Sequence, residues 1–436
     1  MYSKLFVVII LGLTAAFRVT GQTDWDLNRC ISFAIENNLS LERLKIRERV
    51  TTEELNQARR NLLPGISASS RAGLHFGRSV DPNTNDIVTT EFFNNSYEIG
   101  ASLTLFNGFR QINQVEYQKF VKRASECNLI NATDDLAFRV LNAYFEVLFE
   151  QGLLKIANDQ VEASALNLRR LEKQVEMGMK SKSDLLDLMA NAEGEKANRI
   201  RVENQLTTAK LKLRQIMNLE GEDDFSLAEY HLWIVPGTQY DGQGLFLSFL
   251  QWSPYFQSME QQLEAGRKAL AVSRAQLFPS LYAQASLASG FYETTRDISG
   301  KTIAFRNQLE NNRNQYLGAT LSIPVFSRGS IRSGIKKARW EFEAAKATVE
   351  EEKQKIYFEM TGHMNDLEAL EKEYNQLVRQ FEADQLAFKA SEKKFGQGVI
   401  SVVEFFITKN RLANSESQLL KSRLQWEFKM RVIDFY

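Results

Sequence analysis

Apolar residues recur every seven positions along two stretches of this chain, and the second stretch repeats the first. Each member of the second set lies 220 residues after its counterpart (360 − 140 = 220). A sustained seven-residue spacing predicts long helices packed as a coiled coil, and a repeat of this length indicates a duplicated supersecondary unit. In order, the members are Val140, Val147, Leu154, Val161, Leu168 and Val175, then Met360, Leu367, Tyr374, Phe381, Phe388 and Phe395.

Both stretches run into the same kind of short break, which contains a glycine, a serine and an acidic residue at matching places. Gly178 and Gly398 supply the backbone freedom needed to turn a long helix back on itself. A serine can cap the returning helix, and an acidic residue in its first turn is favourable for the helix dipole. Each copy is therefore predicted to be a very long helical hairpin. The capping candidates are Ser181, Ser183 and Ser401, and the acidic residues are Asp184 and Glu404.

Before each hairpin the apolar spacing changes from helical to alternating. The first copy has two such runs within about 66–106, and the second has two within about 280–326, the last reaching Val325. Polar loops separate the runs of each pair. Runs of about 10 to 12 residues fit one membrane crossing by a tilted strand, and aromatic residues cluster near their ends as in an interfacial girdle.

These patterns divide the chain into two repeats and a junction. We expect the first repeat at 22–218, an irregular junction at 219–244 and the second repeat at 245–436. Each repeat opens with a helix, the first over 25–62 with a possible interruption at Asn37-Asn38, the second continuing to Leu277. The helical hairpins are expected at about 109–218 and about 328–436, where the first long helix alone would measure about 100 Å.

Residues 1–21 have the composition of a signal peptide. Lys4 precedes a short apolar core, and small residues lie just before Gln22, so the mature chain is expected to be exported. A short buried helix is the alternative for this segment. Cys30 lies inside an amphipathic pattern, which argues against a lipid anchor on that residue.

Composition and motifs argue against catalysis. The 436 residues carry no formal net charge, which gives no reason to expect a nucleic-acid partner. The three histidines are isolated, and the sequence has no phosphate-binding loop, zinc-ligand spacing or nucleophile elbow. We therefore expect no enzyme activity, no cofactor and no metal. Cys30 and Cys127 both occupy apolar helical phases, which favours buried free thiols over a disulfide.

Four membrane-length strands are too few to close a barrel, and an open sheet edge in lipid leaves backbone groups without hydrogen-bond partners. Two chains would supply eight strands and three would supply twelve. The long helices would then close alongside as a tube. Two other architectures compete: an exported coiled-coil scaffold without a pore, and a general diffusion porin. The porin is disfavoured because a general diffusion porin has no need for a helical extension of about 100 Å.

Taken in order, the amphipathic opening from Trp25, the two strand pairs and the two glycine-serine-acid breaks resemble the TolC family of outer-membrane efflux and secretion ducts. The resemblance covers essentially the whole mature chain. It implies a mainly α fold with a small β part: a trimeric 12-stranded barrel, four strands from each chain, continuous with a long periplasmic tunnel of coiled-coil helices. It also implies a passive duct in the outer membrane of a Gram-negative bacterium, with a periplasmic extension.

The resemblance also implies partners and site residues. A homotrimer in outer-membrane lipid would receive substrate from a periplasmic membrane-fusion adaptor and an inner-membrane pump of the resistance-nodulation-division or ABC type. The gate residues would be Glu404, Asp184 and Phe395, although Ile400 and Ile407 stand where the family pattern has a cation and a second acid. The adaptor-binding tips would be Met177, Gly178, Met179 and Ser181 in the first copy, and Gln397, Gly398, Val399 and Ser401 in the second.

Overall fold

The computed structural model describes residues 25–80, 85–89, 91–221, 225–228 and 242–435. The expected signal peptide and most of the expected junction lie outside these residues. The described helices are α1 (Leu27–Asn37), α2 (Leu39–Arg60), α3 (Arg110–Glu176), α4 (Lys182–Met217), α5 (Gly242–Trp252), α6 (Pro254–Ala275), α7 (Phe305–Asn311), α8 (Ser330–Gly396) and α9 (Val402–Phe435). The strands are β1 (Gly65–His75), β2 (Arg78–Val80), β3 (Ile87–Thr89), β4 (Phe92–Phe106), β5 (Ser280–Tyr292) and β6 (Asn314–Ser322).

The chain divides into two compact units, each built from separate stretches of sequence. One, the hairpin unit, contains α1, α4, the parts of α3 and α8 nearest their turns, and nearly all of α9. The other, the sheet unit, contains α2, the described strands β1 to β6, α5 to α7 and the remaining parts of α3 and α8. Among the described helices, none combines the length and the apolar character that crossing a lipid bilayer requires.

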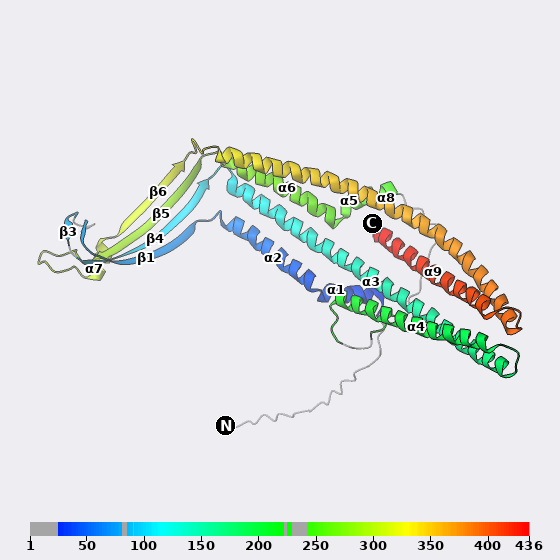
Figure 1. The fold of residues 1–436 in the computed structure, drawn as a ribbon. Helices are drawn as coiled ribbons and strands as arrows, with labels where there is room; N and C mark the ends of the chain where they lie inside the picture. Colours follow the sequence, from blue (N-terminus) through cyan, green and yellow to red (C-terminus); the bar gives the residue numbers. More distant parts are fainter. Residues whose placement is uncertain (1–24, 81–84, 90, 222–224, 229–241, 436) are drawn as a thin grey trace, which may run out of the picture. The chain divides into compact units, whose positions relative to one another are not determined.

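The sheet unit carries a four-stranded antiparallel sheet in the order β1-β4-β5-β6, and Figure 1 shows these strands side by side. The central β4–β5 pair joins the two repeats, with Ile99 opposite Leu287. Alternation puts apolar residues of all four strands on one face, and many of them are exposed, including Ile66, Ile99 and Leu317. A sheet whose apolar face is left bare within one chain is typical of a surface that meets lipid or other chains.

The two strand pairs confirm the predicted alternation, but three details of the prediction were wrong. β6 ends at Ser322 rather than reaching Val325, because Pro324 has no N–H to donate to a ladder. The single helix expected to continue to Leu277 is two helices, and α5 already begins at Gly242, inside the expected junction. The break follows from Ser253, which caps α6, and from Pro254 in the first turn of α6.

A short helix, α7, lies in the loop between β5 and β6 that the sequence indicated only as polar. Gln308 fixes it to the sheet: its Oε1 accepts from the Tyr292 N–H at 3.0 Å, and its Nε2 donates to the Tyr292 and Ile303 carbonyls at 3.0 and 2.8 Å. Phe305 adds ring contacts to Tyr97 and Phe291. These contacts, which come from tertiary packing, order a segment with little helical pattern of its own.

In the hairpin unit, the interruption at Asn37-Asn38 is real and has a structural partner. The Asn38 amide donates to the Ile216 carbonyl at 3.2 Å, and the Asn218 amide donates to the Asn37 carbonyl at 3.3 Å. Asn218 ends α4 in a left-handed conformation with φ 55°. The two asparagine side chains thus bind the end of α1 to the end of α4.

Both cysteines are free thiols, as expected. Cys30 is fully buried in α1, and burial raises its pKa to about 12. Cys127 in α3 is only half-buried, so its expected burial is incomplete, and burial again raises its pKa. Neither thiol has the lowered pKa of a reactive cysteine.

The corners that lead from strand into long helix use the same device in both repeats. Gly108 and Phe109 have φ values of 65° and 64° before α3, and Arg328 and Gly329 have 49° and 79° before α8. The two glycines differ in their surroundings. A Cβ at Gly108 would lie 2.6 Å from the Ala275 carbonyl oxygen, whereas a Cβ at Gly329 would meet nothing within 4 Å.

This difference predicts unequal effects of two matched substitutions. Gly329→Ala should lower the free energy of unfolding by about 1–2 kcal/mol, the cost of a left-handed conformation with a Cβ. Gly108→Ala should cost about 1–3 kcal/mol more, because backbone must also move. Denaturant titration of the purified protein in detergent, followed by circular dichroism at 222 nm, measures both, and equal losses would contradict the prediction.

Candidate functional site at the hairpin tips

The turns of the two helical hairpins have the same hydrogen-bond geometry. The Met179 N–H donates to the Gln174 carbonyl and the Gly178 N–H to the Val175 carbonyl, at 2.8 and 2.9 Å. In the second copy, Val399 and Gly398 repeat this pattern toward Lys394 and Phe395 at 2.9 and 3.0 Å. These two backbone hydrogen bonds, together with a glycine in the left-handed conformation, form the Schellman motif. The φ values of 73° at Gly178 and 77° at Gly398 confirm the role predicted for the two glycines.

The returning helices are capped by the expected serines. The Ser181 hydroxyl accepts from the Asp184 N–H at 3.1 Å, and the Ser401 hydroxyl accepts from the Glu404 N–H at 3.2 Å. The acidic side chains therefore lie in the first turns of α4 and α9, where the helix dipole favours them. Ser183, the third capping candidate, lies inside α4.

Apolar side chains project from both tips into solvent. Met177 and Met179 are 63% and 59% exposed, and Val399 is 68% exposed. Lys180 of the first tip reaches the second, since its Nζ would lie 3.8 Å from a Cβ at Gly398. The two tips thus form one surface with exposed methionines on one side and valine on the other, and with a lysine between them. We call this the tip surface.

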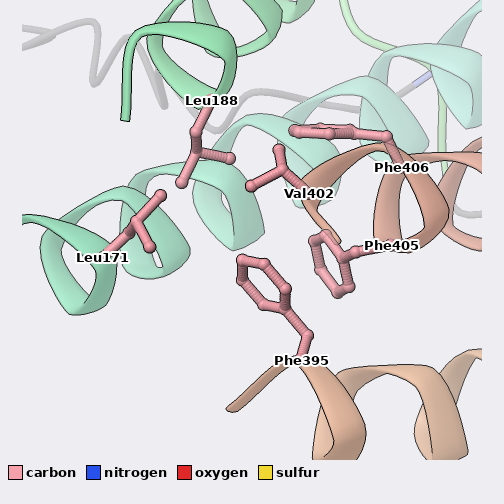
Figure 2. Packing of buried hydrophobic residues seen from close by; sticks show 6 residues of the cluster. All are labelled: Leu171, Leu188, Phe395, Val402, Phe405 and Phe406. Carbon is pink, nitrogen blue, oxygen red and sulfur yellow. The ribbon is translucent and has the colours of Figure 1, made fainter. Parts of the chain in front are cut away.

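Beneath the tip surface lies an apolar core contributed by both hairpins. Figure 2 shows that it brings together side chains from α3, α4, α8 and α9. The rings of Phe395 and Phe405 stack with centroids 4.5 Å apart. Phe395 is buried here rather than exposed, so any part it has in a gate acts through packing. The core residues are Leu171, Leu188, Phe395, Val402, Phe405 and Phe406.

The two acidic candidates for a gate have different environments. Glu404 is exposed on α9, whereas Asp184 on α4 is half-buried. Ile407, which follows Glu404 by three residues on α9, is also exposed. An exposed carboxylate followed by an exposed apolar side chain therefore marks this part of α9. Among the described residues, no group of histidine, cysteine and acidic side chains has the arrangement of a metal site.

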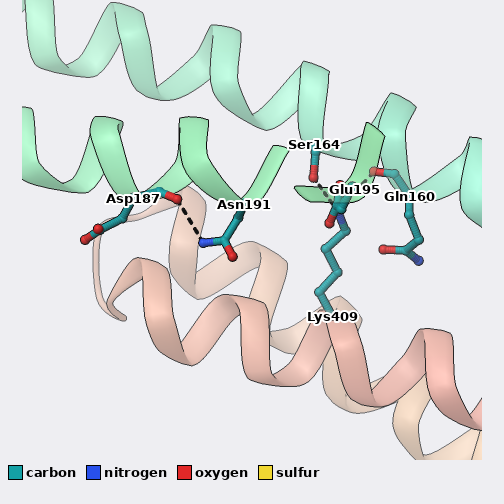
Figure 3. Close-up of polar contacts among 6 residues, drawn as sticks. All are labelled: Gln160, Ser164, Asp187, Asn191, Glu195 and Lys409. Atoms are coloured by element: carbon teal, nitrogen blue, oxygen red, sulfur yellow. Dashed lines mark hydrogen bonds and ion pairs between the residues drawn. The ribbon is translucent and has the colours of Figure 1, made fainter. Parts of the chain in front are cut away.

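A buried lysine that the sequence reasoning missed lies next to this core. Lys409 on α9 is 1% exposed, and Figure 3 shows it reaching from α9 to the first hairpin. Its ammonium donates to the Gln160 carbonyl at 3.0 Å, to the Glu195 carboxylate at 2.7 Å and to the Ser164 hydroxyl. Its three N–H groups thus have three acceptors. Burial lowers the pKa of Lys409, and the Glu195 carboxylate opposes that effect.

The position of Lys409 in the sequence is a signal that its side chain is buried between helices. It lies four residues after Phe405 and three before Leu412, on the face that the apolar stripe of α9 presents to its neighbours. Its counterpart in the first copy is Met189 (409 − 220 = 189), which is exposed. A charged residue at an apolar phase in one copy only was the available signal.

The chain matches known proteins over nearly its whole length. The model of a family described as "Outer membrane efflux protein" matches residues 30–219 and 247–429. Outer membrane protein TolC of Vibrio cholerae serotype O1 is 22% identical over 425 residues, which cover 95% of this chain and 92% of that protein. The solved outer-membrane channel OprN superposes with a TM-score of 0.80 at 19% identity, covering 93% of this chain and 88% of that one. The outer membrane protein VceC from Vibrio cholerae also gives 0.80, at 15% identity.

The core beneath the tip surface predicts a local effect of substitution. Phe405→Ala removes a fully buried ring that stacks on Phe395, and should cost about 3–5 kcal/mol. Amide hydrogen exchange should become faster around both turns, because the core contains residues of both hairpins. The matched control is Val403→Ala, whose side chain is exposed and should leave exchange unchanged. Unaltered exchange in Phe405→Ala would show that this core does not stabilise the tips.

Proposed function

Because the chain belongs to the outer membrane efflux protein family, we propose that it is the outer-membrane duct of a tripartite efflux or type I secretion system. It would carry substrate from a periplasmic adaptor and an inner-membrane pump to the cell exterior. The family consists of passive channels of the Gram-negative outer membrane rather than enzymes. Energy for transport would therefore come from the pump.

The sheet supports a trimer as the working form. Within the described residues, β1 and β6 each pair on one side only, so the sheet of one chain has two open edges. In lipid each unpaired backbone group costs several kcal/mol, which requires the edges to pair with those of other chains. Three chains with four strands each give a closed barrel of 12 strands, a size within the range of outer-membrane barrels.

The tip surface is the proposed docking site for the adaptor, and its exposed apolar side chains are the observation that carries this proposal. Schellman turns and serine caps hold the backbone of both tips, while Met177, Met179 and Val399 extend beyond the buried core. A rigid backbone with exposed methionines suits the burial of apolar surface against a partner. The proposed contact residues are Met177, Gly178, Met179, Ser181, Gln397, Gly398, Val399 and Ser401.

Docking predicts a loss of adaptor binding when the methionines become charged. Burying one such side chain contributes about 1.5–3 kcal/mol, so Met177→Asp with Met179→Asp should weaken the complex by at least about tenfold. Met177→Leu with Met179→Leu is the control that keeps the apolar surface. Titration of the purified duct with its cognate adaptor measures both. If the aspartate variant assembles normally and binds the adaptor with wild-type affinity, the tip surface is not the docking site.

Glu404 is proposed to contribute to the gate at the tip end of the duct, with Asp184 as its counterpart in the first copy. Its exposed carboxylate would favour cations in a narrow opening. Because Ile407 is apolar, the gate of this chain would have a different closing network from one with two acidic rings.

Charge removal at Glu404 tests this role. Glu404→Gln keeps the size of the side chain and should change single-channel conductance in planar bilayers, or weaken block by divalent cations. Glu392→Gln, on α8, is a control that also removes one carboxylate. Conductance and block identical to the wild type in Glu404→Gln would remove Glu404 from the gate.

An exported coiled-coil scaffold without a pore is the competing function. The same purified protein separates the two: a trimer that forms channels supports the duct, whereas a monomer that inserts into no membrane contradicts it.

A further inference from the structure

The duplication creates a problem of pairing that apolar packing alone does not solve. Both hairpins present apolar residues at seven-residue spacing, so a shift of seven residues, or an exchange of one copy for the other, still places apolar side chains together. The seven-residue stripes by themselves therefore do not select one alignment. In coiled coils a single buried polar residue can set register and partner, at a cost in stability.

The alignment that the chain adopts is well defined where α3 meets α9. The rings of Phe145 and Phe428 lie 5.9 Å apart, and a Cβ at Gly152 would lie 2.3 Å from a Leu420 methyl carbon. Further along, Ser164 accepts from Lys409. Residue numbers rise along α3 as they fall along α9, so the two helices run antiparallel in one register.

In the observed register, Lys409 donates hydrogen bonds to the acceptors around it, and neither residue that a seven-residue shift would bring to its place could do the same. Moving α9 by seven residues one way would replace Lys409 with Glu416, whose carboxylate would face that of Glu195. Moving it the other way would bring in Val402, which has no donor for Glu195 or for the Gln160 carbonyl. An acceptor left buried without a partner is unfavourable, and two buried like charges are more so.

The acceptors that surround Lys409 also distinguish the two copies. If a first hairpin took the place of the second, Met189 would stand where Lys409 does and would leave Glu195 without its cation. The second hairpin has a polar pair of its own that the first lacks. Arg411 binds the buried Asp384 at 2.7 Å between α9 and α8, whereas the corresponding residues of the first copy are Asn191 and Ser164.

We propose that Lys409 and Glu195 select which hairpins pair, and in which register, as the helical part assembles. Lys409 is a positioning residue in this role, and the role requires no transported substrate or adaptor. A buried ion pair gives weak support to stability, since apolar residues of similar volume are often equally stable or better. Selection of one pairing is the property that such replacement would remove.

Disulfide cross-linking in the full-length protein tests the proposal. In a background with Cys30→Ala and Cys127→Ala, Gly152→Cys with Leu420→Cys reports the observed register. Gly152→Cys with Ala413→Cys reports the shift that brings Val402 to the place of Lys409. Placing the Gly152→Cys and Leu420→Cys substitutions on two differently tagged, co-expressed chains reports pairing between chains.

Three variants are compared with the wild type in each reporter. Lys409→Met leaves Glu195 without a cation. Lys409→Met with Glu195→Met makes the site apolar. Lys212→Met is the matched control, because it removes an exposed α4–α3 ion pair, 2.6 Å to Glu146, in the same unit.

We expect Lys409→Met to lower the thermal midpoint and to raise the shifted and interchain products by about tenfold. The doubly apolar variant should recover the midpoint but keep those products raised. Lys212→Met should behave as the wild type. The proposal is overturned if either Lys409→Met or the doubly apolar variant gives shifted and interchain products at the wild-type level. It is also overturned if Lys212→Met raises these products as much as Lys409→Met does.

Discussion

Backbone hydrogen bonding at the two open edges of the sheet is the constraint on which the rest of the molecule depends. Within the part of the chain that the structure describes, β1 and β6 are the outer strands of the four-stranded sheet, and each pairs on one side only. A hydrocarbon environment offers no water to those groups, so an isolated chain cannot be the membrane form. Helices α3 and α8 each come after a strand, and two left-handed residues form the corner before each helix. Closing the sheets in the proposed trimer would therefore also bring the helices of different chains together.

That coupling explains why the helices need features that packing does not provide. When chains must assemble, each hairpin has several similar apolar stripes within reach, its own and those of other chains. Apolar stripes stabilise packing but select weakly between alignments, because a shift of seven residues again brings apolar positions together. Polar groups that are satisfied in one alignment only, such as Lys409 with its three acceptors, add discrimination at a desolvation cost. Adhesion and discrimination thus come from different residues of the same helix.

The sequence predicted the features that depend on local rules. Gly178 and Gly398, the serine caps at Ser181 and Ser401, and the alternation of the four long strands follow from backbone freedom, capping and strand period, and all appear as expected. The errors in the predicted helices have two origins. The break between α5 and α6 follows a local rule, because Ser253 followed by Pro254 is a signal for the start of a new helix. Helix α7 depends on Gln308 contacts with β5, which no local pattern encodes.

Lys409 could not be assigned a role from the sequence for a different reason. Its place on an apolar phase of α9 can be identified from the sequence, but its role depends on contacts among three helices. Its position on an apolar phase is local information, whereas its acceptors come from α3 and α4, more than 200 residues earlier in the chain. Comparison of the two copies gives part of the information about long-range contacts that the local pattern lacks. Where the copies agree, as at the turn glycines and capping serines, the residues serve the geometry that every hairpin needs. Where they differ, as between exposed Met189 and buried Lys409, the geometry common to both hairpins does not explain the residue, which is consistent with a role that distinguishes one hairpin from the other.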